Sequence, residues 1–167
     1  MSLSVEQQEK LRKRKNKRLS EYRILALDVA TNCGWATENA SGCWNLGIKR
    51  DESSGMRLLR FREKLKEVIK LENINVVAFE RSAGRHQNAV ITQSELHGVL
   101  KIFCEDSGMV YRAYSAAEIK KFATGKGNAG KPAMIAAAKE KLGYTGSNDN
   151  EADALWIYNL AKSDLSN

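Results

Sequence analysis

Short, nearly continuous apolar runs alternate along the chain with longer segments in which apolar residues recur every three or four positions. The runs Tyr22–Ala30 (YRILALDVA) and Ile74–Glu80 (INVVAFE) are typical of buried strands. Between them, GWATE and CWNLGIK predict two more strands, joined by a turn at Asn39–Gly42 into an antiparallel hairpin. The run Met109–Tyr114 (MVYRAY) predicts a fifth strand.

Helical spacing predicts five helices after the hairpin. In the first of them, Leu58, Phe61 and Leu65 share one face, and charged residues occupy the opposite face. Ser115 is placed to cap a short helix, and Pro132 suits the first turn of the next helix. The five helices are expected over residues 53–72, 88–106, 115–123, 132–142 and from 148–150 to 162.

A hairpin followed by strand–helix–strand units predicts an α/β fold. We expect a mixed five-stranded sheet, three antiparallel strands and then parallel β-α-β units, with helices on both faces. No internal repeat, low-complexity linker or second-domain boundary is evident in the sequence. Residues 22–167 are therefore expected to form a single domain, preceded by an extension of residues 1–21.

The extension carries much of the excess positive charge. The chain has 167 residues and a net charge of +7, and residues 1–23 contain eight basic and three acidic residues. The run Lys10–Arg18 (KLRKRKNKR) is compatible with a basic arm that lies along phosphates. A solvated tail or an interaction helix unrelated to nucleic acid fits the same pattern. Ser4 and Gln7 match a capping box, which predicts a helix from about Val5.

The cysteines and the apolar runs bear on localisation. The chain has three cysteines, Cys33, Cys43 and Cys104, without CxxC spacing, which favours reduced thiols in a cytoplasm over a zinc site or a disulfide framework. No apolar run is long enough to cross a bilayer, and no signal-peptide pattern opens the chain. We therefore expect a cytoplasmic protein without membrane contact.

Carboxylates follow both buried strands and begin the last helix. Asp28 and Glu80 end strands that can lie adjacent and parallel, and sites in open α/β sheets form at such carboxyl ends. In the stretch GSNDNEADALWIY, Asp149 and Asp153 are four residues apart, and Asn150 and Asp153 are three apart. Either spacing places both side chains on one helical face. Each acid alone has an ordinary structural explanation, such as a turn, an ion pair or a helix cap.

Converging carboxylates without a neighbouring histidine or cysteine suit hard cations. Mg²⁺ and Mn²⁺ prefer oxygen ligands, and two such ions roughly 4 Å apart activate a water and stabilise the leaving oxygen of a phosphodiester. Without a cation, an acidic cluster would repel DNA. A bound metal therefore explains how the acids and a basic surface serve the same substrate.

Four segments in order resemble the motifs of one enzyme family. They are ILALDVATNCGWA, VVAFERS, YSAAEIKKFATGKGNAGK and NEADALWI. Over Tyr22–Lys162 the chain resembles the RuvC family of Holliday junction resolvases, particularly its shorter phage-type members. The resemblance implies a ribonuclease H-like fold, a homodimer and metal-dependent, paired nicking of four-way or otherwise branched DNA. For a phage protein, the expected location is the host cytoplasm.

The resemblance also assigns roles to the acids. Asp28 would be shared between two ions, Mg²⁺ or Mn²⁺; Glu80 would bind one ion and help to place the attacking water; and Asp153 would complete the site. The family usually has an aspartate or histidine three residues before the last aspartate, where this chain has Asn150. Asp149 is favoured as the fourth ligand, with Asn150 second.

The other acid of this segment, Glu151, is expected to point outward. His97 lies on a helix that packs at a two-fold dimer interface in the family, which favours a structural role. The three tryptophans, Trp35, Trp44 and Trp156, fall in strand or helix patterns and are expected in the core.

Basic residues that could hold DNA fall in two segments. The glycine-rich segment TGKGNAGK lacks the GxxxxGK[ST] spacing of a nucleotide-binding loop, so no nucleotide cofactor is expected. A solvated helix–helix connection is the alternative interpretation of this segment. The polar loop RSAGRHQNA directly follows Glu80 and is expected to reach toward the junction. The candidate DNA-binding residues are Arg81, Arg85, His86, Lys120, Lys121, Lys126 and Lys131.

Two other functions fit the same residues. A ribonuclease H-like nuclease for RNA–DNA hybrids or flaps would use the same acids, since the chemistry involves only a phosphodiester. A DNA-junction-binding protein that has lost catalysis is favoured by Asn150 alone, and the intact Asp28, Glu80 and Asp153 weigh against it. Junction resolution is the leading prediction.

Overall fold

The computed structural model describes residues 4–10, 13, 21–82 and 87–167. Its centre is a five-stranded sheet with the strand order β3-β2-β1-β4-β5. The first three strands pair antiparallel, whereas β1 pairs parallel with β4 and β4 with β5. The predicted mixed sheet is therefore confirmed. The strands are β1 (Ile24–Asp28), β2 (Asn32–Ala36), β3 (Ser41–Asn45), β4 (Val76–Glu80) and β5 (Val110–Tyr114).

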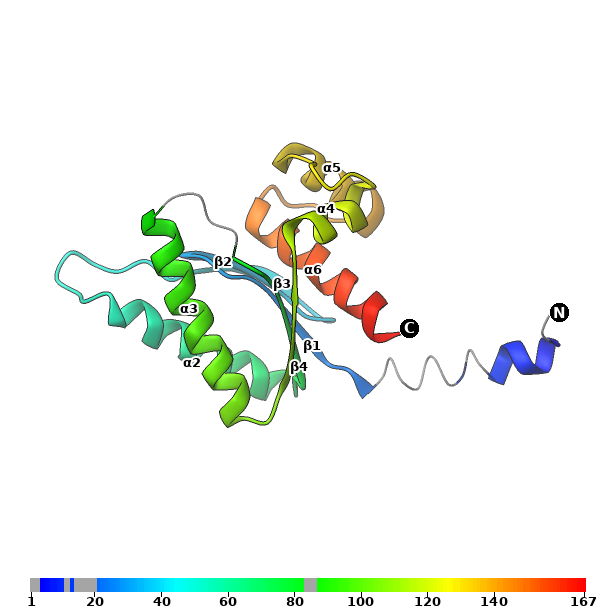
Figure 1. Ribbon diagram of the computed structural model, residues 1–167, viewed down its shortest axis with the longest axis horizontal. Coiled ribbons are helices and arrows are strands. Elements are labelled where there is room, and N and C mark those ends of the chain that lie inside the picture. Colours follow the sequence, from blue (N-terminus) through cyan, green and yellow to red (C-terminus); the bar gives the residue numbers. More distant parts are fainter. Residues whose placement is uncertain (1–3, 11–12, 14–20, 83–86) are drawn as a thin grey trace.

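Helices cover both faces of the sheet (Figure 1). On one face lie α2 (Gly55–Leu71) and α3 (Gln87–Asp106). The other face carries α4 (Ala116–Thr124), α5 (Lys131–Leu142) and α6 (Asp149–Leu165). No helix in the described part of the chain is long and apolar enough to cross a membrane.

The two sides of the sheet differ in side-chain size. Toward α2 and α3, β1 buries Leu25 and Leu27 in a cluster of large aliphatic and aromatic residues. Toward α6, the strands bury the small residues Ala26, Ala36 and Ala78. Because small side chains let backbones approach closely, α6 lies directly against β1 and β2. This close packing brings the start of α6 to the edge where β1 ends.

Local signals place several helix boundaries as predicted. The Ser115 side chain accepts a hydrogen bond from the Glu118 N–H at 3.2 Å, and the Glu118 carboxylate accepts one from the Ser115 N–H at 2.7 Å, which completes a capping box for α4. Pro132 lies in the first turn of α5. Residues 5–10 are helical, and Ser4 and Gln7 make the expected reciprocal hydrogen bonds at 3.0 and 3.2 Å.

The β2–β3 hairpin turns earlier than the pattern predicts. The pattern predicts a turn at Asn39–Gly42, whereas residues 37–40 make it. The Thr37 side-chain oxygen accepts hydrogen bonds from the N–H groups of Asn39 and Ala40 at 3.3 and 3.2 Å. A hydroxyl that bonds the backbone two residues further along initiates a turn. Both hairpin strands therefore begin about two residues earlier than expected.

The expected core residues are largely confirmed. Trp44 and Trp156 are buried, and the Trp156 indole N–H donates to the Met134 carbonyl at 3.1 Å. Trp35 is only partly buried and stacks on Trp44, with ring centroids 5.7 Å apart. All three cysteines are free thiols; Cys33 and Cys104 are buried and Cys43 is exposed.

Candidate active site

Asp28 and Glu80 lie side by side at the carboxyl ends of two adjacent central strands. The two acids are the last residues of β1 and β4, which pair in parallel. In this pairing Leu27 lies opposite Phe79, so Asp28 and Glu80 occupy the next position of each strand. Both are half-buried, in contrast to the fully buried residues before them. The parallel pairing thus places two carboxylates together, as the sequence predicts.

The first turn of α6 lies against β2 at Gly34, the residue that pairs with Asp28. A Cβ on Gly34 would come within 1.9 Å of the Asn150 carbonyl oxygen. Only glycine is compatible with this backbone approach. Gly34 therefore allows Asp149 and Asp153 to reach the edge that holds Asp28 and Glu80. Its positioning role was not predicted from the sequence, because the signal is a single glycine inside an ordinary strand pattern.

The electrostatics show that the carboxylates act as a group. Burial raises the pKa of Asp28 well above its usual range, and neighbouring carboxylates raise it further. Burial likewise raises the pKa of Asp153 to about 6, with additional contributions from Glu80 and Asp149. The carboxylates that act on Asp28 are, in decreasing order, Asp153, Glu80 and Asp149. The structure thus brings together all four acids predicted from the sequence.

Two lysines partly neutralise this acidic cluster. Burial raises the pKa of Glu80, and Lys120 opposes that shift. Lys131 donates a hydrogen bond to Asp149 at 2.5 Å, which lowers the pKa of Asp149 and raises that of Lys131. Asp149 is therefore the one of the four acids whose pKa is lowered, because its charge is already paired.

Asn150 and Glu151 face other parts of the protein. Asn150 lines a cavity together with Ala30 and Thr31 of the β1–β2 turn. Glu151 is expected to point outward, but this expectation is wrong. Its carboxylate is half-buried and accepts hydrogen bonds from the hydroxyls of Ser41 at 2.7 Å and Tyr144 at 3.1 Å. Glu151 thereby links α6 to β3 and to the loop before the helix.

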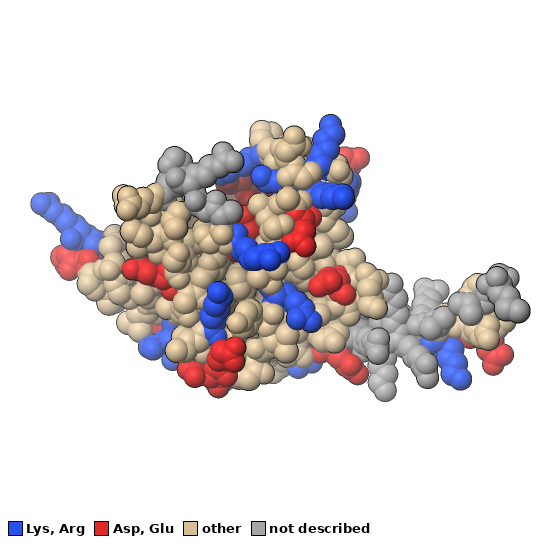
Figure 2. Space-filling model, in the orientation of Figure 1, with Lys and Arg blue, Asp and Glu red and all other residues tan. Residues whose placement is uncertain are grey.

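Basic side chains gather over the α4–α5 region (Figure 2). Lys121 and Lys126 are exposed, Lys120 is half-buried on α4, and Lys131 begins α5. Gly125 ends α4 in the left-handed conformation, with φ of 80°, which explains a glycine there by local geometry. Of these lysines, Lys120 and Lys131 lie within electrostatic reach of the carboxylates, and Lys126 is exposed in the loop between the two helices.

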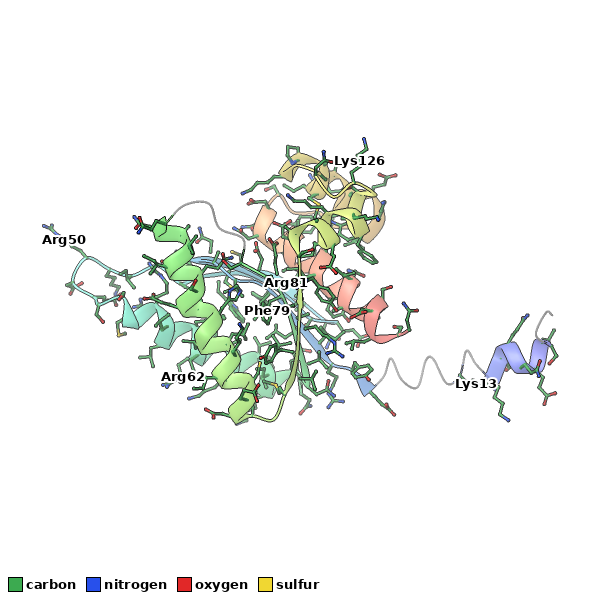
Figure 3. The ribbon with its side chains drawn as sticks, in the orientation of Figure 1. Lys13, Arg50, Arg62, Phe79, Arg81 and Lys126 are labelled. Carbon is green, nitrogen blue, oxygen red and sulfur yellow. The ribbon has the colours of Figure 1, made fainter. Side chains whose placement is uncertain are left out.

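The loop after Glu80 is only partly described. Arg81 is exposed and forms an ion pair with Glu118 at 3.1 Å (Figure 3). Arg85 and His86, two further candidates for DNA binding, lie outside the described residues.

His97 supports the strand end that carries Glu80. The ring is buried and packs against Phe79, the residue before Glu80, with ring centroids 5.1 Å apart. Burial lowers the pKa of His97, and Lys101 lowers it further. These contacts agree with the structural role expected for His97.

Comparison with known proteins identifies the family. A sequence model of the family described as "Crossover junction endodeoxyribonuclease RuvC" matches residues 30–158, more than half of the chain. The chain belongs to the RuvC family. It is therefore a crossover junction endodeoxyribonuclease, a hydrolase of phosphodiester bonds. No curated protein matches the chain in a sequence search.

Solved structures share the RuvC fold with this chain. The structure of Thermus thermophilus RuvC has a TM-score of 0.70 at 20% identity and covers 84% of this chain and 94% of its own. The same enzyme in complex with a Holliday junction substrate has a TM-score of 0.70 at 18% identity, and the match covers 86% of this chain and 97% of that chain. The yeast mitochondrial Holliday junction resolvase has a TM-score of 0.59 at 13% identity, and the match covers 99% of this chain and 89% of that chain. The expected ribonuclease H-like fold is thereby confirmed.

RuvC-family nucleases generally use divalent metal ions. In the described residues, no three His, Cys, Asp or Glu side chains are already close enough together to hold a metal ion. The donor set nevertheless fits a hard cation, because partly buried carboxylates raise one another's pKa and lack a full complement of positive charge. The residues that would hold the metal are Asp28, Glu80, Asp153 and, after release from Lys131, Asp149.

Proposed function

We propose that this protein resolves four-way DNA junctions by paired hydrolysis, using the carboxylates of Asp28, Glu80, Asp149 and Asp153. The observation that carries the proposal is their convergence from three separate elements at the carboxyl ends of β1 and β4, in a chain of the RuvC family. The relative from Thermus thermophilus, described in complex with a Holliday junction substrate, supports branched DNA as the substrate.

Two Mg²⁺ or Mn²⁺ ions are the proposed cofactors. Bound there, such ions would activate a water and stabilise the leaving oxygen. Asp28, whose pKa is raised by burial and then by Asp153, Glu80 and Asp149, would be shared between both ions, and Glu80 and Asp153 would complete the site. Their charges, which repel one another in the free protein, would then be offset by the metal.

Asp149 is a better candidate than Asn150 for the fourth ligand. The Asp149 carboxylate acts on the pKa values of Asp28 and Asp153, which places it within electrostatic reach of both. Asn150, by contrast, lines the cavity beside Thr31. The Lys131 ammonium pairs with Asp149 in the free protein and is exposed, so it can turn to a phosphate when a metal takes its place.

The lysines of the α4–α5 region would hold the DNA backbone. Lys120 and Lys131 lie within electrostatic reach of the acids, and Lys121 and Lys126 are exposed in the same α4–α5 region. Each phosphate that these lysines neutralise releases counterions. Arg81, at the end of β4, can join them when it exchanges Glu118 for a phosphate. Arg85, His86 and the basic extension of residues 1–21 are further proposed contacts. The extension precedes a proposed nuclease domain of residues 22–167.

A homodimer is the proposed active form. Ile91 and Ile102 on α3 and Val110 on the edge strand β5 are exposed by 51, 63 and 51%. Exposed aliphatic side chains on one helix and its neighbouring edge strand favour contact with a second copy. A two-fold dimer would place two active sites on a two-fold symmetric junction. We further propose a phage-type protein that acts in the host cytoplasm, consistent with its free thiols.

Cleavage of end-labelled DNA tests the proposal. A synthetic four-way junction, a matched duplex, a flap and an RNA–DNA hybrid are each incubated with Mg²⁺, with Mn²⁺ or with chelator. Paired nicks in the junction alone, dependent on metal and lost in Asp153→Asn, are expected. Glu151→Gln is the matched control, because Glu151 lies on the same helix but bonds to Ser41 and Tyr144; this variant should keep its activity.

Other outcomes would redirect the assignment. Preferential cleavage of the hybrid or the flap would retain the metal site but change the substrate. Tight junction binding without cleavage in either metal would indicate a junction-binding protein that has lost catalysis.

A further inference from the structure

A pocket of about 520 Å³ lies between α3 and the strands β4 and β5. Phe79 of β4 and Tyr111 of β5 line the sheet side, and Ser94, His97 and Lys101 line the helix side; we call this space the α3–β5 pocket. None of the four acids of the candidate active site lines it. Its volume lies within the roughly 300–1,000 Å³ typical of pockets for small ligands. The pocket therefore has room for a small molecule and is separate from the acidic cluster.

The α3–β5 pocket is positively charged. Lys101 on α3 and Arg81, directly after β4, both line it, and no described residue that lines it is acidic. Arg81 pairs with Glu118, which lies outside the pocket, whereas Lys101 forms no ion pair within the described residues. A hollow lined by charges of one sign attracts the opposite sign. The pocket therefore favours an anion.

His97 contributes a hydrogen-bonding atom that no other group uses. The residue is 7% exposed, and its Nε2 atom is buried without a hydrogen-bond partner in the described part of the chain. A buried polar atom without a partner is costly, and a ligand oxygen bonded to Nε2 would remove that cost. Burial and Lys101 lower the pKa of His97, so the ring is neutral at neutral pH and can donate its single N–H from Nε2.

Two hydroxyls without partners add to this set. Ser94 and Tyr111 line the pocket, and neither hydroxyl makes a hydrogen bond to another described residue. Hydroxyl, imidazole and ammonium groups together are donors of the kind that bind phosphate oxygens, and bonds from the charged donor are the strongest. The donors on α3 need no rearrangement of the core to reach a ligand, because Ser94 and Lys101 are exposed.

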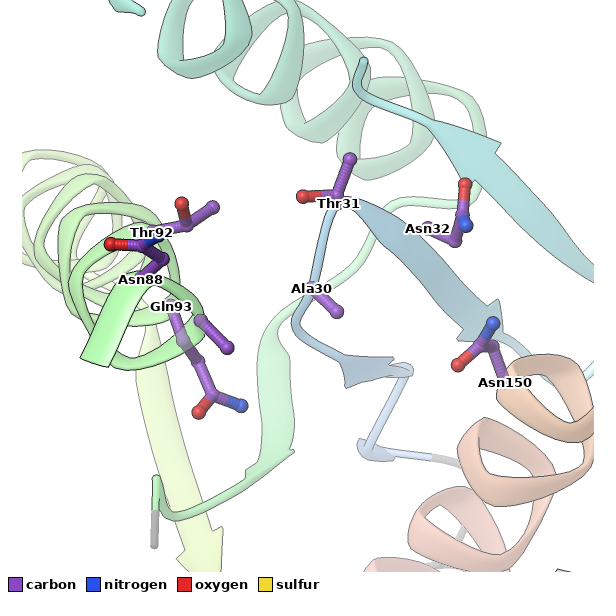
Figure 4. Close-up of a pocket in the computed structure, with 8 residues that line it drawn as sticks. Ala30, Thr31, Asn32, Asn88, Thr92, Gln93 and Asn150 are labelled. Atoms are coloured by element: carbon purple, nitrogen blue, oxygen red, sulfur yellow. The ribbon is translucent and has the colours of Figure 1, made fainter. Parts of the chain in front are cut away.

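The pocket is connected to the candidate active site by a short chain of hydrogen bonds. Ser82 lines the pocket and donates to the Gln93 side-chain oxygen at 2.7 Å. Gln93 donates in turn to the Val29 carbonyl at 3.1 Å and lines the separate cavity beside the β1–β2 turn (Figure 4). Val29 directly follows Asp28. A ligand in the pocket would therefore contact a segment bonded to the strand of Asp28 without competing for the acids.

The depth of the pocket distinguishes between two kinds of phosphate. A phosphodiester within a DNA strand carries a single charge and has a sugar on either side, so it lies along a surface. A phosphate monoester carries about two negative charges at neutral pH and ends the molecule, so it can reach the buried ring of His97. The remaining volume beside Tyr111 suits an organic group attached to that phosphate.

We propose that the α3–β5 pocket binds a phosphate monoester of the size of a mononucleotide, through Lys101, Ser94 and the Nε2 atom of His97. Free mononucleotides and the 5′-phosphorylated ends of DNA strands both present this group. The inference goes beyond the proposed function and does not depend on it, because these residues belong neither to the acidic cluster nor to the α4–α5 lysines.

Isothermal titration calorimetry of the full chain in chelator tests the pocket with thymidine 5′-monophosphate. We expect a dissociation constant below roughly 1 mM, and thymidine, which lacks the phosphate, should not bind. Lys101→Ala should weaken binding by roughly tenfold or more, the effect of losing one charge-assisted hydrogen bond, and Ser94→Ala should weaken it less. Lys70→Ala removes the same charge from an exposed position on α2 and should bind like the unmodified protein.

Proton–nitrogen NMR of the imidazole rings shows whether the phosphate reaches the buried histidine. The chain has two histidines, so His86→Gln assigns the remaining signals to His97. The Nε2 signal of His97 should shift when thymidine 5′-monophosphate is added. At the same ligand concentration the shift should be much smaller in Lys101→Ala. A structural role of His97 alone would leave the signal unmoved in both proteins.

Oligonucleotides with and without a 5′-phosphate identify the source of the ligand. Tighter binding of the free nucleotide assigns a mononucleotide, and tighter binding of the phosphorylated strand, weakened by Lys101→Ala, assigns a DNA end. Absence of binding by either ligand up to roughly 10 mM, or equal binding of thymidine, would overturn the inference. Binding that Lys126→Ala abolishes and Lys101→Ala retains would also overturn it, because the phosphate would then lie on the α4–α5 surface. Junction cleavage, measured separately, decides on the proposed function alone.

Discussion

Replacing Asp153 with asparagine should stabilise the metal-free protein at neutral pH. The pKa of Asp153 is raised to about 6, against an ordinary value of 3.8, mainly by burial and then by the charges of Glu80 and Asp149. The folded state therefore holds this proton more tightly than the unfolded chain does. As the pH rises from about 4 through about 6, the protein must ionise a carboxyl that the fold disfavours, and stability is lost.

The size of the effect follows from the shift. A shift of about two pKa units corresponds to about 3 kcal/mol, and partial solvent screening reduces this to about 2 kcal/mol. Asp153→Asn keeps the shape of the side chain and removes the charge. We expect its free energy of unfolding at pH 7.5 to exceed that of the unmodified protein by about 2 kcal/mol. Near pH 4 the difference should nearly vanish, because Asp153 is then protonated in the folded protein.

Urea denaturation in the presence of chelator measures the effect, and Asp149→Asn is the matched control. That change removes the same charge four residues earlier on α6, but it also breaks the ion pair with Lys131. Loss of the pair and relief of repulsion oppose each other, so the control should change stability by less than about 1 kcal/mol. Saturating Mg²⁺ should stabilise the unmodified protein more than Asp153→Asn. An Asp153→Asn protein no more stable than the original at pH 7.5 would refute the description of Asp153 as a destabilised, charge-repelled acid.

Three further predictions concern packing, DNA and assembly. Gly34→Ala should lower the free energy of unfolding by at least about 2 kcal/mol in urea melts, because the new Cβ would clash with the Asn150 carbonyl; wild-type stability would contradict this. Lys126→Ala should weaken junction binding on all sequences alike and reduce the slope of log affinity against log salt by about one, and an unchanged slope would exclude a phosphate contact. Ile102→Glu should shift the protein from dimer to monomer in sedimentation velocity experiments, whereas an unchanged dimer would place the interface elsewhere.

The amino-acid sequence by itself determined most of the local structure. Strand and helix periods, the Ser115 cap and Pro132 at the start of α5 depend on neighbours within a few residues, and each is confirmed. The adjacency of Asp28 and Glu80 was also predictable, because both end buried strands of one parallel pair. Where local hydrogen bonding competed with the apolar pattern, as at Thr37, the predicted boundary was displaced.

Only the tertiary structure decided how α6 faces the sheet. Helical spacing placed Asp149, Asn150 and Asp153 near one another but could not say which neighbours each would meet. That depends on where the helix packs, which Gly34 and the small alanines of β1, β2 and β4 determine from far away in the sequence. The same packing pairs Asp149 with Lys131, turns Asn150 toward a cavity and engages Glu151 with Ser41. Close contact between distant segments depends on steric complementarity, and the periodicity of either segment carries no record of its partner.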